Sequence, residues 1–182
     1  MAYPYSLDDY VTQLKEFMAV NNIHKPHVIA HSFGARVAIK ATSLDGELFS
    51  KLVLTGAAGL KPKRTLKKAI KKSIFNLLKK FTSKEKLTRF YSKDYLSLDP
   101  IMRQSFIKIV NEHLDQNLSS INNKTLIIFG EKDKQTPLYM AKRLNKNITN
   151  SRLKIIEDAG HFCFIDKPYT FNMEVGEFLF SK

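Results

Sequence analysis

Residues 28–36 read Val28-Ile29-Ala30-His31-Ser32-Phe33-Gly34-Ala35-Arg36, a short apolar run followed by a segment compatible with a helix. Ser32 lies between two small residues, Ala30 and Gly34. Small neighbours allow a strand to turn sharply into a helix, and the turn residue then has strained backbone geometry and an exposed side chain. The usual pattern is G-x-S-x-G; the alanine in the first position adds one methyl group and remains compatible with the turn. Ser32 is therefore a candidate nucleophile.

Apolar runs and helical periodicities alternate along the chain on both sides of this stretch. Between the strands we expect helices, and parallel strands joined by helices form a sheet with helices on both faces. We therefore predict an α/β fold with a mostly parallel sheet of about four strands. The predicted strands are 27–31, 51–56, 125–130 and 152–158. The predicted helices are one that begins after Ser6 and stops near Asn21-Asn22, 33 to about 43, 137 to about 145, and one that begins at Pro168.

Residues 61–122 do not follow this alternation and divide the chain into core segments 1–60 and 123–182. An apolar stripe from Leu66 to Phe81 recurs at helical spacing, with lysines mostly off it. Asp99-Pro100 can begin a second helix that carries Phe106, Ile107 and Val110. This segment is predicted to be an amphipathic helical insert.

Three short motifs at the ends of predicted strands together resemble the α/β-hydrolase family. The stretch around Ser32 resembles its nucleophile elbow, the loop from Gly130 through Asp133 to Pro137 its G-x-x-D-x-x-x-P loop, and Gly160-His161 its G-H segment. A serine hydroxyl is a weak nucleophile that needs a base and a group to orient that base. The resemblance implies that His161 is the base and Asp133 the orienting acid. Glu131 is the competing carboxylate, although it lacks the motif position.

The resemblance also implies the reaction and the shape of the site. Ser32 would form an acyl-enzyme, and the backbone N–H of Phe33 would be one donor of the oxyanion hole. Residues 61–122 would be the cap that shapes the pocket, and the expected substrate is a small apolar ester or a related acyl compound, with activated carbon–carbon bonds as another option. We expect no cofactor and no metal site.

The resemblance covers only the C-terminal part of the family's fold, since a single helix precedes the Ser32 strand. The strands of the N-terminal part, and the loop that supplies the second oxyanion donor, have no counterpart here. Loss of one such donor costs roughly two to three orders of magnitude in rate. The Ser32 strand would also be an unpaired edge. We therefore expect pairing of that edge with a missing N-terminal part or with a second copy of the chain.

Two other functions stay open at this point. The chain could be a truncated, catalytically impaired fragment or a non-catalytic scaffold of the same family. Its net charge of +13 would also suit a basic module that binds nucleic acid or membrane through residues 61–89. Lysine-rich solvated faces explain that charge more simply, so we expect no nucleic-acid partner. The absence of a secretory signal and of a long apolar run predicts a cytoplasmic enzyme without stable membrane insertion.

Overall fold

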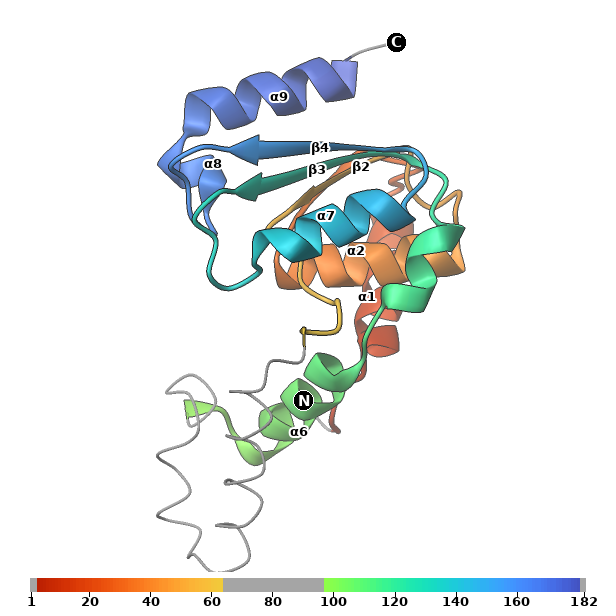
Figure 1. Cartoon of the computed structure of the whole chain (residues 1–182). Helices are drawn as coiled ribbons and strands as arrows, with labels where there is room; N and C mark the ends of the chain where they lie inside the picture. The colour runs from red at the N-terminus through yellow and green to blue at the C-terminus, as the bar shows by residue number, and fades with distance from the viewer. Residues whose placement is uncertain (1–2, 64–96, 181–182) are drawn as a thin grey trace, which may run out of the picture.

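A computed structural model describes residues 3–63 and 97–180, and four parallel strands form its sheet (Figure 1). The strands follow one another across the sheet in chain order, each hydrogen-bonded to the next. This confirms the predicted α/β fold and its parallel sheet. The strands are β1 (Val28–His31), β2 (Lys51–Thr55), β3 (Lys124–Gly130) and β4 (Ser151–Ile156).

Helices cover both faces of the sheet. One face carries α1 (Leu7–Val20), α2 (Phe33–Leu44) and α7 (Leu138–Asn147), and the opposite face carries α9 (Pro168–Phe180) (Figure 1). The molecule therefore has three layers. Two short elements were not predicted, the 3₁₀ helix η2 (Asp115–Ser120) and the one-turn helix α8 (Cys163–Asp166).

The central strands are buried on both faces, which explains their unbroken apolar sequences. In β2, Leu52 and Leu54 pack into the core under α1, α2 and α7, whereas Val53 packs into the core under α9. Alternate side chains of β3 divide between the same two cores. Burial of both faces fixes the register of these strands, because a shift by one residue would exchange the two sets of side chains.

Local capping signals set the helix bounds. The Ser6 hydroxyl accepts a hydrogen bond from the backbone of Asp9, and the Asp9 carboxylate accepts one from the backbone of Ser6 at 2.6 Å, which forms a capping box at the start of α1. Asp99 caps α6 (Pro100–Asn111) with its side chain, which accepts hydrogen bonds from the backbone N–H groups of Ile101 and Met102.

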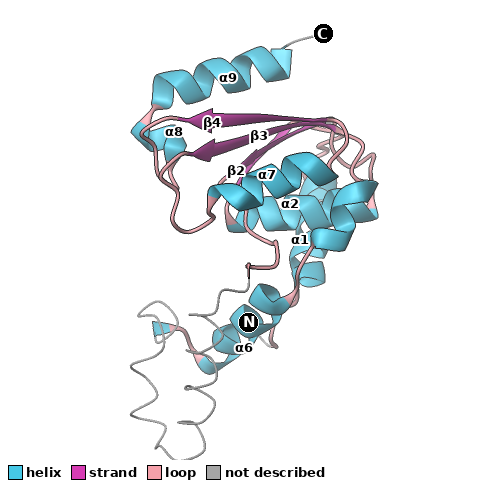
Figure 2. Ribbon diagram, in the orientation of Figure 1, coloured by secondary structure: helices cyan, strands magenta, loops and turns pink. Residues whose placement is uncertain are grey.

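Helix α6 lies away from the sheet, beside the start of the chain (Figure 2). It belongs to the segment that the sequence predicts as an insert. The apolar stripe from Leu66 to Phe81 lies outside the described residues. At the other end of the segment, Leu114, Leu118 and Ile121 pack into the main core under α2 and α7.

β1 forms one edge of the sheet, and Ile29 on it is 53% exposed. One side of this short strand bonds β2, so the backbone on its other side has no neighbouring strand within the described residues. None of the helices in residues 3–63 and 97–180 is long and apolar enough to cross a membrane.

Candidate active site

Ser32 occupies a strained turn between β1 and α2. Its backbone dihedrals are φ 49° and ψ −108°, in the left-handed half of conformational space that non-glycine residues seldom enter. Two bonds hold it there: its N–H donates to Thr55 O at 3.0 Å, and its carbonyl accepts from Ala58 N at 3.1 Å. Phe33 is the first residue of α2, so its N–H has no partner within the helix.

Asp133 and His161 form a buried pair at the same edge of the sheet. Asp133 follows β3 and is 5% exposed; His161 follows β4 and is 8% exposed. His161 Nδ1 donates to Asp133 Oδ2 at 2.8 Å. Thr136 completes the environment of the carboxylate, because its hydroxyl donates to Oδ2 at 2.7 Å and its backbone N–H to Oδ1 at 2.9 Å.

The hydrogen bonds keep Asp133 ionised despite its burial. Burial by itself raises the pKa of a carboxyl group, because it disfavours the charged form. The bonds from His161 and Thr136 outweigh that effect, and the pKa of Asp133 lies below its ordinary value. The carboxylate can therefore hold the His161 ring with Nδ1 protonated and Nε2 available as a base.

The His161 ring extends over the end of β2 towards β1. A Cβ atom on Gly56, at the end of β2, would lie only 3.0 Å from His161 Cε1. On the far side, the rings of His161 and His31 have centroids 4.6 Å apart, and His31 Nε2 lies 3.1 Å from the carbonyl oxygen of His161. His161 thus reaches the residue that precedes Ser32. Within the described residues, its ring makes no hydrogen bond to Ser32 Oγ.

The loops that carry Asp133 and His161 are fastened to each other by their backbones. Glu131 N donates to Ile156 O at 2.9 Å and Lys132 N to Ala159 O at 2.8 Å. The approach is so close that a Cβ on Gly130 would collide with the carbonyl oxygens of Ala159 and Gly160. Glycine is therefore required where β3 passes into the Asp133 loop.

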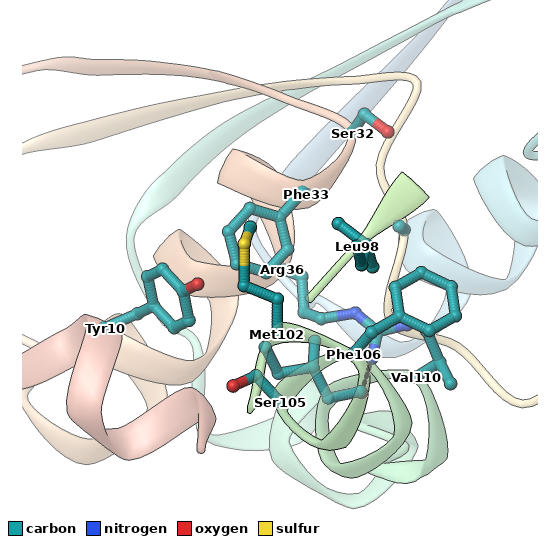
Figure 3. Close-up of a pocket in the computed structure, with 11 residues that line it drawn as sticks. Tyr10, Ser32, Phe33, Arg36, Leu98, Met102, Ser105, Phe106 and Val110 are labelled. Carbon is teal, nitrogen blue, oxygen red and sulfur yellow. Dashed lines mark hydrogen bonds between the residues drawn. The ribbon is translucent and has the colours of Figure 1, made fainter. Parts of the chain in front are cut away.

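A cavity of about 370 Å³ opens beside Ser32 (Figure 3). Side chains of α1, α2 and α6 form its walls, and Figure 3 shows Tyr10, Phe33 and Met102 around one part of it. Most of the lining is apolar, with Phe106, Ile109 and Val110 on α6. Arg36, one helical turn after Ser32, is a charged exception. The site thus adjoins a pocket suited to an apolar group.

The structure brings Asp133 and His161 into contact and places Ser32 at the same end of the sheet. Glu131, the competing carboxylate, instead accepts a hydrogen bond from Asp158 N at 3.2 Å. Within the described residues it makes no hydrogen bond to the His161 ring. Sequence reasoning missed Thr136, Gly56 and Arg36. Only Thr136 had a local signal, since a threonine three residues after an aspartate can close a turn onto its carboxylate.

In the described parts of the chain, no group of three or more histidine, cysteine, aspartate or glutamate side chains is arranged to hold a metal ion. The lone cysteine, Cys163, is fully buried, with its sulfur 3.3 Å from Thr55 Oγ1. Burial raises the pKa of this thiol, which keeps it protonated and unreactive.

Comparison with known proteins adds a family match over more than half of the chain. The model described as "alpha/beta hydrolase fold" matches residues 67–168, a range that includes Asp133 and His161. Among curated proteins, the uncharacterized hydrolase YugF of Bacillus subtilis is 25% identical over 175 residues. That alignment covers 84% of this chain and 64% of YugF. This chain thus spans somewhat less than two thirds of that relative.

Two further matches concern enzymes that are named for their substrates. The 2-hydroxy-6-oxo-2,4-heptadienoate hydrolase of Pseudomonas putida is 22% identical, and the alignment covers 96% of this chain and 71% of the enzyme. The solved structure of the meta-cleavage product hydrolase CumD from Pseudomonas fluorescens IP01 is 27% identical with a TM-score of 0.71. It covers 98% of this chain and 73% of CumD.

Proposed function

Because this chain belongs to the alpha/beta-hydrolase fold family, we propose that it is a serine hydrolase with Ser32 as nucleophile, His161 as base and Asp133 as orienting acid. The observation that carries this proposal is the 2.8 Å bond between His161 Nδ1 and Asp133 Oδ2 in a buried site. The strained backbone of Ser32, at the same edge of the sheet, supports it further. A structural ion pair alone would not require a strained serine nearby.

The reaction follows from these positions. Ser32 Oγ attacks the carbonyl carbon of the substrate while His161 Nε2 takes its proton, and the Phe33 N–H donates to the developing oxyanion. When the tetrahedral intermediate collapses, His161 gives the proton to the leaving group. A water molecule then attacks the acyl-enzyme with His161 again as base, which releases the acid and restores Ser32. The bond between His161 and Ser32 Oγ that the first step requires forms when substrate binds, since such bonds are often long in empty sites.

The cavity favours a small apolar acyl group. Its volume of about 370 Å³ holds a short chain or a single ring, and α6 supplies most of its apolar surface. An ester is our first choice of substrate. Hydrolysis of an activated carbon–carbon bond is the second. The similar enzymes of P. putida and P. fluorescens are named as hydrolases of 2-hydroxy-6-oxo-2,4-heptadienoate and of a meta-cleavage product.

We propose in addition that the free edge of β1 is paired by another strand in the active protein. The edge is unpaired within the described residues, and Ile29 on it is half exposed, so water now covers an apolar surface next to Ser32. A strand added there would also bring a second N–H donor close to the oxyanion. Sedimentation of the chain alone, together with an esterase assay, tests this: a monomer with full esterase activity would contradict it.

The cytoplasmic location stays a prediction from the sequence, as does the division of the chain into segments 1–60, 61–122 and 123–182.

Labelling with a fluorophosphonate probe tests the serine hydrolase directly. We expect covalent modification of Ser32, located by mass spectrometry, and its loss in Ser32→Ala and His161→Ala. Ser120→Ala, which removes an exposed hydroxyl on η2, is the matched control and should label normally. If a strand-supplying partner is restored and Ser32 still does not label, the chain is a non-catalytic scaffold and the proposal is wrong.

A further inference from the structure

Arg36 is almost fully buried and joins the nucleophile helix to α6. It is 8% exposed and lies one turn after Ser32 on α2. Its Nη1 donates to the carbonyl oxygens of Ile109 and, at 3.2 Å, Glu112. Figure 3 shows the side chain extending from α2 towards α6, with a dashed bond at its end.

The charge of this arginine is stabilised by the end of a helix. Burial lowers the pKa of the Arg36 guanidinium, because it disfavours the charged form. The nearby Glu112 carboxylate partly opposes this lowering of the pKa, but within the described residues no carboxylate forms an ion pair with Arg36, and Glu112 bonds Lys40 at 2.8 Å. The two carbonyl acceptors lie at the C-terminal end of α6, where the helix dipole favours a cation. The C-terminal end of α6 is therefore the partner of Arg36.

Two further contacts hold α6 in the same place. Lys40, one turn beyond Arg36 on α2, bonds both Glu112 and, at 3.2 Å, Asp8 on α1. Nearer the N-terminal end of α6, Tyr5 N donates to Ser105 Oγ at 2.8 Å. These contacts fix α6 against α1 and α2 with Phe106, Ile109 and Val110 lining the cavity beside Ser32.

We propose that Arg36 is a positioning residue that sets the acyl specificity of the site by fixing the distance between the α6 wall and Ser32. The proposal rests on the serine hydrolase function argued above. With the end of α6 held, Phe106, Ile109 and Val110 face an acyl chain that extends from Ser32. A substrate whose acyl chain is long enough to reach this wall binds more tightly when the wall is held in place. An acetyl group is too short to reach it.

The test is the dependence of kcat/KM on acyl length in a series of p-nitrophenyl esters from acetate to octanoate. Arg36→Met keeps the length of the side chain and removes its donors. We expect the hexanoate-to-acetate ratio of kcat/KM to fall by about tenfold, mostly through KM, since a bond from a charged donor is lost. Arg36→Lys, which keeps the charge but not the planar fork, should lie between wild type and Arg36→Met.

A second variant keeps the test independent of the folding of Arg36→Met. Lys40→Met loosens the same end of α6 from outside the cavity, so it should shift the ratio in the same direction by a smaller factor. Arg152→Met removes an exposed arginine that pairs with Glu174 and Glu177 on α9, and it should leave the ratio unchanged.

Two outcomes would overturn the inference. An equal loss for all chain lengths in Arg36→Met and Lys40→Met means that neither residue positions the wall. A loss confined to p-nitrophenyl hemiglutarate, whose acyl chain carries a carboxylate, means that Arg36 binds an anion instead. If the wild type hydrolyses none of these esters, fluorophosphonate labelling decides the proposed function, and the inference is decided by the relative affinities of hexanamide and acetamide for wild type and variants, measured by NMR titration.

Discussion

Asp133→Asn is expected to leave the fold intact and to force the wrong tautomer on His161. Asp133 Oδ1 accepts from the backbone N–H groups of Gln135 and Thr136, and the amide oxygen of asparagine can keep both bonds. The amide nitrogen then replaces Oδ2 and donates. The Thr136 hydroxyl can rotate to accept, but His161 Nδ1 can accept only after it loses its proton. The proton moves to Nε2, where a general base must be unprotonated.

The expected magnitudes follow from the bonds that change. All four hydrogen bonds to the carboxylate, each worth about 1.5–3 kcal/mol, become neutral bonds worth about 0.5–1.5 kcal/mol, and part of this loss is offset because a buried charge is also removed. The free energy of unfolding should therefore fall by about 2 kcal/mol. Loss of the correct tautomer should lower the rate of esterolysis and of fluorophosphonate labelling by about 10⁴-fold.

The tautomer can be read from the ¹⁵N shifts of the His161 ring, and stability from urea unfolding. Asp158→Asn is the control, since this exposed carboxylate pairs with Lys132 at the surface and touches no part of the site. We expect it to match wild type in all three measurements. Persistence of Nδ1–H in Asp133→Asn, or labelling at the wild-type rate, would refute the role given to this carboxylate.

Thr136→Val should lower the free energy of unfolding by about 1.5–3 kcal/mol at pH 7. The buried carboxylate that it contacts has a lowered pKa, so its stabilising effect is present above the unfolded value of about 3.9 and is lost as the pH falls through the folded pKa. The difference between Thr136→Val and wild type should therefore shrink below about pH 3.9, and urea unfolding across pH would contradict this if the difference stayed constant. Gly130→Ala should destabilise by about 3 kcal/mol or more, because its Cβ meets backbone, whereas Gly176→Ala, with open space around it, should be neutral or stabilising in thermal melts. Gly56→Ala should displace the His161 ring and slow labelling of the serine with little loss of secondary structure by circular dichroism; an unchanged rate would show that the ring tolerates the extra methyl.

The sequence by itself determined the four strands and the longer helices of the described residues, and their order along the chain. Capping residues such as Ser6 and Asp99, and the switch from apolar runs to helical spacing, act within a few residues, so they can be read without knowledge of the rest of the chain. The same locality marks Ser32, Asp133 and His161, because each follows a strand and lies in a short pattern of its own. Parallel strands place their carboxyl ends at one edge of the sheet, so these residues could be expected to gather there.

Only the tertiary structure decided how that edge is assembled. Gly56 matters because the His161 ring, from a loop more than a hundred residues later, lies over it. Arg36 matters because it bonds carbonyl groups at the end of α6, 73 and 76 residues away in the chain. A backbone carbonyl carries no mark in the sequence, since every residue has one. The pattern around Ser32 therefore predicted a nucleophile, whereas the shape of the cavity beside it depends on contacts between distant segments that only folding brings together.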